Sequence, residues 1–287
     1  MLTNDILSVN FRPQGAELTS IIHKPTNTEH LWQGDPAVWG WHAPNLFPVV
    51  GGCLNNQIVV DGVAYPMGRH GFARQSTFAL VEQTDTRALF ALTSSDETRT
   101  AYPYAFVFEI DYALEGNSLS VTYRVRNTDT RTVYFSVGAH PAFNVPFGPG
   151  EAYETYYLEF EETEPLMTHL LSKGGYFTGE TQPVPTEENR LPLTKHLFDQ
   201  DALVLKNLRS RQVRIRSRNH DHSVTVAFDG FPYLGLWAKP GAPFVCIEPW
   251  LGCADSVGEP VEFSQKELIQ SVAVGAVFEA TFRVTVG

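Results

Sequence analysis

Three short polar segments interrupt an otherwise regular sequence and hold the residues best suited to chemistry. They are Gly68–Arg74, Gly138–Asn144 and Val245–Trp250. The first two each contain a histidine, His70 and His140, and the third contains a carboxylate between apolar residues. Histidine and carboxylate side chains are the usual groups for moving protons near neutral pH. The three segments together therefore indicate acid–base chemistry.

Glu248 stands in the most informative of these segments. Phe244–Ile247 has the composition of a fully buried strand, so the carboxylate that follows lies where water is scarce. Such a group is either paired or hydrogen-bonded, or its pKa rises toward neutrality. A carboxylate of raised pKa suits a general base, and Trp250 beside it suits contact with the face of a sugar. A structural role as a hydrogen-bond acceptor is the alternative for a single buried glutamate, as it is for a single histidine.

Two further clusters resemble functional sites less closely. His220 and His222 share one face of an extended segment and offer metal ligands, but Arg218, Asn219 and Ser223 beside them indicate a solvated turn. Arg214, Arg216 and Arg218 alternate with Val213, Ile215 and Ser217, which predicts the wet face of an amphipathic strand. The alternative for these arginines is a phosphate site, since guanidinium groups bind phosphate in a bidentate manner.

The elements that must position these segments are strands. Ser118–Asn127 and Phe106–Leu114 alternate between apolar and polar residues, and Glu115–Asn117 between them forms a short turn. This pattern predicts an antiparallel hairpin. The same alternation returns at Phe278–Val286 and in the shorter face formed by Val224, Val226 and Phe228.

The whole chain follows this all-β pattern. No segment keeps a period of 3.6 with caps at both ends, and 22 glycines and 19 prolines punctuate the sequence at short intervals. Internal repeats and dividing linkers are absent, and the Pro/Glu/Thr-rich stretch Thr178–Leu193 is expected to form a long loop. We therefore predict an all-β protein, a large antiparallel β-sandwich in which residues 1–287 form a single domain.

Composition and charge limit the partners. A net charge of −11 disfavours nucleic acid and anionic membrane surfaces, because like charges repel. Cys53, Cys246 and Cys253 are too few for a disulfide framework, which favours a reducing compartment. No signal peptide is recognisable, and no apolar run approaches the ~20 residues that span a bilayer. The expected location is the cytoplasm.

The three polar segments resemble those of the aldose 1-epimerase family, in particular its LacX-like branch. A G-x-H-P-x-F-N segment contains His140, a C-I-E-P-W segment contains Glu248, and an R-H-G-F-x-R segment contains His70 and Arg74. The segments Asp35–Trp39 and Ala43–Pro48 also resemble that branch, so the likeness extends from about residue 10 to the C-terminus. Three motifs in the family's order form a specific signal.

The resemblance assigns roles to residues of this chain. It implies that His140 is the general acid, Glu248 is the general base, and His70 steadies the substrate. The substrate-binding residues that it implies are Arg74, Asp201, Asn56, Phe143 and Trp250. Asp201 is preferred to Asp199 because Asp-Ala-Leu fits the LacX-like pattern better. The chain departs from the family at Gly51–Asn56, where Cys53 takes the position at which many relatives have an arginine near the sugar.

The resemblance also implies a fold and an activity. The fold would be a galactose mutarotase-like supersandwich, and the activity that of an aldose 1-epimerase, an isomerase that interconverts α and β anomers by acid–base opening and closure of the ring. Such an enzyme needs no cofactor and no metal, in agreement with the absence of a dinucleotide fingerprint or a P-loop. The expected partner is a small-molecule sugar, and the expected state is a monomer or a weak homodimer.

Three alternatives remain open from the sequence. The first is a hexose-6-phosphate epimerase of the same superfamily. The second is a non-catalytic carbohydrate-binding sandwich, against which the joint presence of His140 and Glu248 counts, because binding alone needs no acid–base pair. The third is a glycoside hydrolase or polysaccharide lyase. A hydrolase usually needs two carboxylates across the bond, and only Glu248 stands in a strong motif, with Asp201 as a weaker second.

Overall fold

Two large antiparallel sheets form most of the protein, and the computed structural model describes all residues from 1 to 287. In spatial order the nine-stranded sheet contains β18 (Arg190–Pro192), β15 (Tyr156–Phe160), β20 (Gln212–Ser217), β21 (Ser223–Ala227), β25 (Val277–Val286), β11 (Ser118–Asn127), β10 (Phe106–Glu115), β9 (Arg87–Thr93) and β8 (Ala79–Gln83). The predicted all-β antiparallel class is confirmed.

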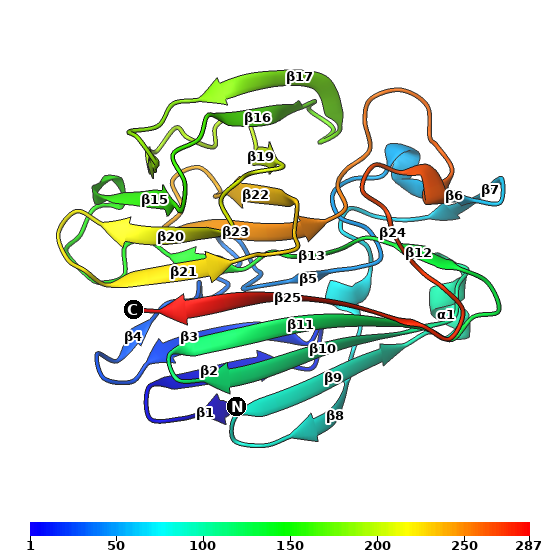
Figure 1. Cartoon of the computed structure of the whole chain (residues 1–287), viewed down its shortest axis with the longest axis horizontal. Coiled ribbons are helices and arrows are strands. Elements are labelled where there is room, and N and C mark those ends of the chain that lie inside the picture. The colour runs from blue at the N-terminus through cyan, green and yellow to red at the C-terminus, as the bar shows by residue number, and fades with distance from the viewer.

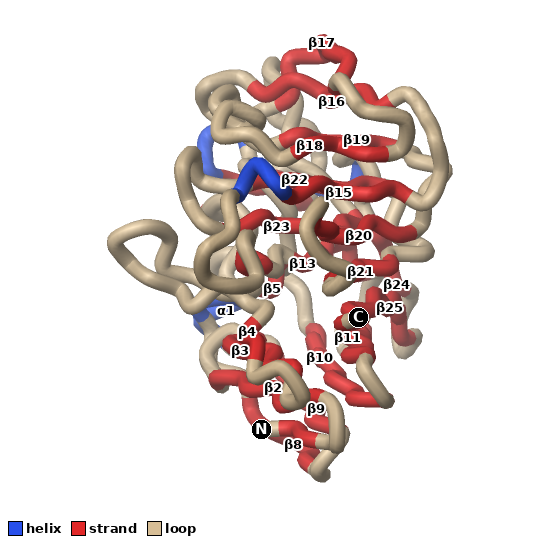
Figure 2. The backbone as a smooth tube through the Cα atoms, turned by 90° about the vertical axis from the view of Figure 1, so that its left-hand side faces the viewer, coloured by secondary structure: helices blue, strands red, loops and turns tan.

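The second large sheet has eight strands. In spatial order it contains β17 (Phe177–Val184), β16 (Leu166–Leu171), β19 (Leu203–Lys206), β22 (Tyr233–Trp237), β23 (Phe244–Leu251), β13 (Val137–Ala139) and β5 (Asn45–Leu46), and β14 (Ala142–Asn144) also pairs with β23. Figures 1 and 2 show β16 and β17 at one end of the molecule and β8 and β9 at the opposite end.

Smaller elements complete the fold. One four-stranded sheet contains β1 (Leu2–Thr3), β2 (Leu7–Arg12), β3 (Glu17–His23) and β4 (Thr28–Glu29), and two two-stranded sheets contain β6 (Gln57–Val60) with β7 (Val63–Pro66) and β12 (Val133–Phe135) with β24 (Gln270–Val272). The short helices are α1 (Asp96–Arg99) and the 3₁₀ turns η1 (Leu54–Asn56), η2 (Ala73–Gln75), η3 (Tyr153–Thr155) and η4 (Phe263–Gln265). None of these helices has the length and apolar character that crossing a membrane requires.

The predicted hairpin is confirmed in β10 and β11. Their register runs from Phe106 opposite Asn127 to Glu115 opposite Ser118, and Gly116 in the turn has a φ of 56°. Alternate side chains of a strand lie on opposite faces, and one face of each strand is buried: Phe106, Phe108, Ile110, Tyr112 and Leu114 of β10 and Leu119, Val121, Tyr123 and Val125 of β11. The two large sheets share one core, since a single cluster of 69 buried side chains includes Phe108 of β10 and Ile247 of β23.

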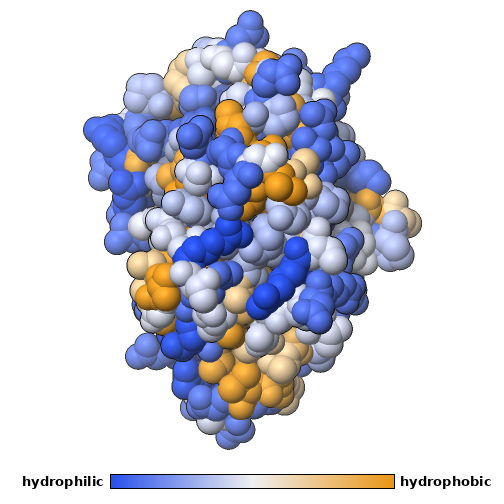
Figure 3. Space-filling view, turned by 90° about the vertical axis from the view of Figure 1, so that its right-hand side faces the viewer, coloured by the Kyte–Doolittle hydropathy of each residue, from blue (hydrophilic) through white to orange (hydrophobic).

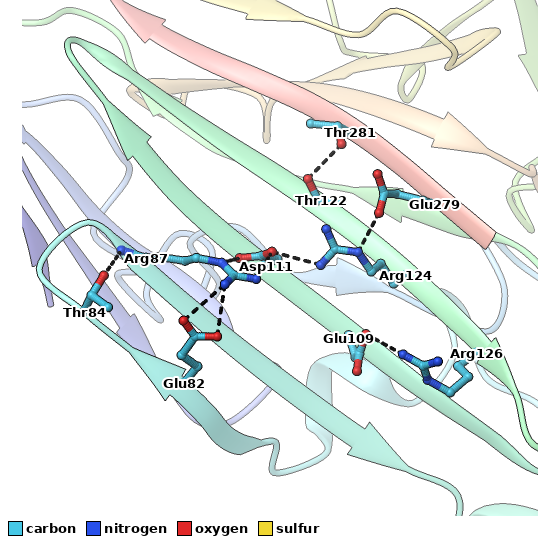
Figure 4. A network of polar contacts seen from close by, with 10 residues as sticks. All are labelled: Glu82, Thr84, Arg87, Glu109, Asp111, Thr122, Arg124, Arg126, Glu279 and Thr281. Carbon is cyan, nitrogen blue, oxygen red and sulfur yellow. Dashed lines mark hydrogen bonds and ion pairs between the residues drawn. The ribbon is translucent and has the colours of Figure 1, made fainter. Parts of the chain in front are cut away.

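Polar residues link the strands on the outer face of β8–β11 and β25 (Figure 4). The carboxylate of Asp111 accepts hydrogen bonds from Arg87 and Arg124, and Arg124 also pairs with Glu279. Burial alone would raise the pKa of Asp111, but the hydrogen bonds from the two guanidinium groups hold that pKa below its ordinary value. Ion pairs between neighbouring strands therefore stabilise the solvent face of this sheet.

One expectation from the sequence is wrong. Residues 178–193 were expected to form a loop, whereas most of this stretch lies in β17 and β18. Strand β17 pairs with β16 at the edge of its sheet, and its central residues are exposed. An exposed edge strand tolerates proline and polar residues on both faces, so its sequence lacks the alternation of a half-buried strand.

The arginine-rich strand is the amphipathic strand that the sequence predicted. Val213 and Ile215 of β20 are fully buried, while Arg214 and Arg216 lie on the outer face. Arg214 lies near Glu159 and Arg218 pairs with Glu187. The surface elsewhere is similarly mixed: Figure 3 shows a mostly hydrophilic face on which apolar residues form small separate groups.

Candidate active site

A cavity of about 230 Å³ opens against the inner part of the eight-stranded sheet. Strands β22 and β23 form one wall, and residues 68–74 and the turn between β16 and β17 form others. The lining residues are Trp39, Gly51, Arg69, His70, Arg74, His140, Leu171, Gly175, Phe177, Asp201, Ala202, Val204, Trp237, Glu248, Trp250 and Ala254.

Glu248 lies near the middle of β23, and all eight residues of this strand are buried. Alternation along the strand places Glu248 on the same side as Cys246 and Trp250. The residue opposite Glu248 on β22 is Gly235, and the ring of Trp250 occupies the space that a side chain at this position would need. Glu248 is only 1% exposed, and its Oε2 atom accepts no hydrogen bond of good geometry. The Trp250 side chain offsets part of the effect of burial on the pKa of Glu248, but the carboxylate has fewer partners than a buried group of this kind usually has.

Strand register brings His140 to Glu248. On β13, Gly138 lies opposite Trp250, and on β14, Ala142 lies opposite Cys246. Continuing that antiparallel register through the Pro141 segment places His140 opposite Glu248. The Nε2 atom of His140 lies 3.3 Å from the Oε2 atom of Glu248. Two segments more than a hundred residues apart thus supply one acid–base pair.

His70 completes the polar centre from another segment. Its ring centroid lies 5.7 Å from that of His140, with the two rings nearly perpendicular. The Nδ1 atom of His70 accepts a hydrogen bond of 3.1 Å from the backbone N–H of Gly51, so the proton of the neutral ring is on Nε2. Gly71 allows this loop to lie close to the sheet, because a Cβ atom there would come within 2.2 Å of the carbonyl oxygen of Phe47.

Burial controls the protonation of these groups. It raises the pKa of Glu248 well above its ordinary value and lowers the pKa of His140 to about 3. Burial also lowers the pKa of His70 well below its ordinary value, and the neighbouring His140 lowers it further. Burial thus disfavours the charged forms of both Glu248 and His140, so a proton shared by the pair is held by the carboxyl group of Glu248 rather than by the imidazole of His140.

Tryptophan rings enclose the polar centre. Trp39 stacks on His140 with ring centroids 5.1 Å apart, and Trp237 meets the same ring edge-on at 5.8 Å. The ring of Trp250 crosses two glycines, since Cβ atoms at Gly138 and Gly235 would lie 2.7 and 2.5 Å from it. Aromatic faces beside hydrogen-bonding groups suit a ligand that has both apolar and polar surfaces.

Charged groups lie around the entrance. Arg69 donates to the carbonyl oxygen of Gly174 at 2.8 Å, and Arg74 donates to the carbonyl oxygen of Arg69 at 3.0 Å. Neither arginine forms an ion pair, so both guanidinium charges remain available to a ligand. Asp201 lines the same cavity with a φ of 120°, a strained backbone for an aspartate.

The structure brings together six of the eight site residues expected from the sequence: His70, Arg74, His140, Asp201, Glu248 and Trp250 all line the cavity. The other two, Asn56 and Phe143, do not line this cavity. Asn56 lies in η1 and faces solvent, with its carbonyl oxygen accepting from Met67 N–H. Phe143 is 0% exposed in the main core, because its place on β14 directs the side chain away from the cavity.

Ten of the sixteen lining residues were not expected, among them Arg69, Trp39, Trp237 and Phe177. Arg69 directly precedes His70, and Trp39 ends the Asp35–Trp39 segment, so both had a signal in the sequence. Trp237 and Phe177 had none. Cys53 is buried and does not line the cavity, whereas the Nη2 atom of Arg69 lies 3.8 Å from the position of a Cβ atom at Gly52. The guanidinium group of Arg69 therefore lies beside Gly52, where the position next in sequence is Cys53.

Comparison with known proteins gives a consistent result. Residues 1–268 match the model of a family described as aldose 1-epimerase. The plasmid-encoded protein LacX of Lactococcus lactis subsp. lactis is 36% identical over 267 residues, covering 90% of this chain and 89% of LacX. The chromosomal LacX protein of the same organism matches equally well.

Solved structures show the same likeness over the full length. A galactose mutarotase related enzyme from Lactobacillus acidophilus has a TM-score of 0.95 and 32% identity, covering 100% of this chain and 96% of that chain. A galactose mutarotase-like protein from Lactobacillus casei has a TM-score of 0.94 and 33% identity, covering 100% of this chain and 99% of that chain.

Proposed function

Since this chain belongs to the aldose 1-epimerase family, we propose that it interconverts the α and β anomers of an aldose, with Glu248 and His140 as its acid–base pair. The observation that carries this proposal is the 3.3 Å distance between His140 Nε2 and Glu248 Oε2 inside a cavity of about 230 Å³. The C1 hydroxyl and the ring oxygen of an aldopyranose are both attached to C1, so a close pair of groups can serve both.

The reaction needs two proton transfers. Glu248 as a carboxylate takes the proton of the C1 hydroxyl, while His140 as an imidazolium delivers one to the ring oxygen, and the ring opens to the aldehyde. Rotation about C1–C2 presents the other face, and the same two groups act in reverse as the ring closes. No redox change occurs, and the enzyme regains its protons in each cycle.

The resting protonation of the pair is compatible with this cycle. Burial favours the shared proton on Glu248 over His140, because the pKa of the carboxyl group is raised and that of His140 is lowered to about 3. Moving that proton to His140 produces the carboxylate and imidazolium without uptake from solvent. A bound sugar supplies hydrogen bonds to both charged forms. His70 has its Nδ1 occupied by Gly51 N–H and so offers its Nε2 proton to a sugar oxygen.

The first test removes each member of the pair. Glu248→Gln keeps the shape of the side chain but cannot accept the proton, so kcat should fall by about 10²–10⁴-fold with little change in KM. His140→Asn should behave in the same way, and the double variant should lose much less than the product of the two effects, because the groups act as a unit. Saturation-transfer NMR measures the exchange of the two anomers directly.

The matched control is Glu115→Gln, an exposed glutamate at the end of β10 that should leave exchange unchanged. Anomer exchange at the wild-type rate in Glu248→Gln would remove this residue as the base. Binding of sugars with no exchange in the wild-type protein would favour the non-catalytic carbohydrate-binding sandwich instead.

A hexose-6-phosphate epimerase is the second candidate, favoured by Arg69 and Arg74. Two guanidinium groups without ion-pair partners line the cavity of a chain with a net charge of −11, and such a pair suits a phosphate group. Arg69→Gln should then raise KM for an aldose 6-phosphate far more than KM for the free aldose. Arg216→Gln, on the outer face of β20, is the control and should change neither. Equal effects of Arg69→Gln on both sugars would exclude the phosphate assignment.

A further inference from the structure

Three metal-binding atom types meet beside the cavity. His140, Cys246 and Glu248 bring a nitrogen, a sulfur and a carboxylate oxygen within 4.8 Å of one another. Cys246 stands two residues before Glu248 on β23 and therefore points to the same side of the strand. The thiol is fully buried and forms no disulfide. The acid–base mechanism described above gives Cys246 no role.

The spacing of these atoms suits Zn²⁺. Zinc bonds of about 2.0–2.3 Å to nitrogen, oxygen and sulfur in a tetrahedron place the donor atoms about 3.3–3.8 Å apart. His140 Nε2 and Glu248 Oε2 are already 3.3 Å apart, and the sulfur needs only a small side-chain adjustment to reach a common centre. A mixed set of imidazole, thiolate and carboxylate donors is one that Zn²⁺ accepts.

Hydrogen bonding and charge also favour a cation here. Glu248 Oε2 is buried and pairs with His140 Nε2 at 3.3 Å without a hydrogen bond of good geometry, so a metal between the two atoms would satisfy both. The charges of a carboxylate and a thiolate would balance those of Zn²⁺. Arg74 opposes a cation at this position, and Asp201 favours it. The cavity in front of the pair leaves the fourth ligand position open to water.

We propose that His140, Cys246 and Glu248 form a Zn²⁺ site whose occupancy excludes sugar turnover. Zinc and the sugar compete because His140 and Glu248 cannot coordinate the metal and exchange protons with a substrate at the same time. The inhibitory part of this inference rests on the proposed function, whereas the metal site itself does not. Free zinc would therefore act as a reversible inhibitor at the acid–base pair.

Direct metal binding tests the site without any assay of activity. Titration of the apo protein with Co²⁺ should give cobalt–thiolate charge-transfer absorption at one equivalent, and titration calorimetry with Zn²⁺ should give one site. Cys246→Ser should abolish the charge-transfer band and weaken Zn²⁺ binding by at least about tenfold. Cys53→Ser and Cys253→Ser remove the other two buried thiols and should leave the band in place.

Cys246→Ala is the second variant, in case serine at this buried position disturbs the fold, and the melting temperatures of all variants are compared. A charge-transfer band that survives in Cys246→Ala or vanishes in Cys53→Ser would overturn the proposal, and so would the absence of Zn²⁺ binding to the wild-type protein. Titration thus decides on the metal site even if no sugar proves to be a substrate.

Kinetics then test the competition. Zn²⁺ should raise the apparent KM of the wild-type enzyme without lowering kcat, and a chelator should restore the initial rate. Cys246→Ser should keep its basal anomer exchange but require at least about tenfold more Zn²⁺ for the same inhibition. Inhibition that is identical in wild type and Cys246→Ser would overturn the proposal while leaving the epimerase function intact.

Discussion

The two buried glutamates of this protein differ in their surroundings. Glu17 accepts hydrogen bonds from the backbone N–H groups of His42 at 2.7 Å and Ala43 at 3.0 Å, and it forms an ion pair with Arg12. Glu248 has no comparable partners, and burial raises its pKa. A buried carboxyl group without partners destabilises the fold when it ionises, a cost that is typical of functional residues.

Opposite effects on stability should follow from neutralising these two side chains. Glu248→Gln should raise the free energy of unfolding at pH 7 by about 0.5–2 kcal/mol. Glu17→Gln should lower it by about 3–5 kcal/mol, because Arg12 loses its buried partner. Thermal denaturation of both variants measures the difference, and a lower melting temperature for Glu248→Gln would contradict this assignment.

The stability that Glu248→Gln adds should depend on pH in a defined direction. A raised pKa in the folded state means that the folded protein binds more protons than the unfolded chain above pH 4.5, the ordinary value for glutamate. Wild-type stability therefore falls with rising pH through this window, and glutamine removes that contribution. The advantage of Glu248→Gln should be small at pH 4 and larger at pH 8.

The dependence of kcat/KM on pH should also reflect the burial of His140 and Glu248. Activity needs one shared proton on the pair, so kcat/KM should fall only when a second proton enters, near the His140 pKa of about 3, or when the raised pKa of Glu248 is passed. The acid limb then belongs to His140 and the alkaline limb to Glu248. In the residual activity of His140→Asn, Glu248 must be ionised to act as the base, so the alkaline limb should disappear and the acid limb should move up to the raised pKa of Glu248. Persistence of the alkaline limb would reverse the assignment.

Most site residues could be predicted because they stand in local sequence motifs. The others could not, because their positions depend on contacts between strands that are distant in sequence. His70, His140 and Glu248 stand in short segments whose composition differs from that of the strands around them. Phe143 lies in the core and not in the cavity lining, and only the register of β14 against β23 determines this. Trp237 reaches the cavity from β22, a strand whose apolar sequence does not distinguish cavity-facing from core-facing residues.

At the scale of the elements, two glycines determine where Trp250 lies. Gly138 on β13 and Gly235 on β22 flank β23, and any Cβ atom at either position would meet the indole ring. The ring can therefore lie across both neighbouring strands and line the cavity beside Glu248.

Gly235→Ala should displace that ring. The backbone at Gly235 does not have a positive φ, so alanine adds only the clash of its Cβ atom at 2.5 Å from Trp250 Cζ2. We expect kcat/KM to fall by about 10–100-fold with an unchanged far-UV circular dichroism spectrum. Gly148→Ala is the control, since a Cβ atom there meets nothing within 4 Å. Full activity in Gly235→Ala would show that the ring position is not critical.

Long alternating strands were predictable, and short or exposed ones were not. β10, β11 and β25 each have ten residues with one buried face, so period two is clear in their sequences. β5, β13 and β14 contain only two or three residues and position the site nonetheless. β13 and β14 pair with β23, and β5 pairs with β13, so these short strands depend on distant partners that local sequence cannot reveal.

At the scale of the whole molecule, β25 joins two groups of strands that are distant in sequence. It pairs with β11 on one side and with β21 on the other, and Figure 1 shows it in red between them. Residues 79–127 and 156–227 therefore form one continuous sheet only through β25.

A single cooperative unfolding transition is the expected consequence. Urea denaturation followed by tryptophan fluorescence and by far-UV circular dichroism should give coincident curves. Removal of residues 277–287 should abolish that transition, since it separates the two groups of strands. Two resolved transitions in the full chain, or a stable truncated protein, would show that the chain folds as two independent parts.

The central place of β25 also affects how the protein is made. During synthesis, β11 and β21 leave the ribosome before β25, the strand that pairs with both of them. Until β25 follows, the nascent protein presents two unpaired strand edges, and these edges favour association with other chains. Chaperone binding and inclusion-body formation should consequently depend on translation speed far more than on the stability of the finished fold.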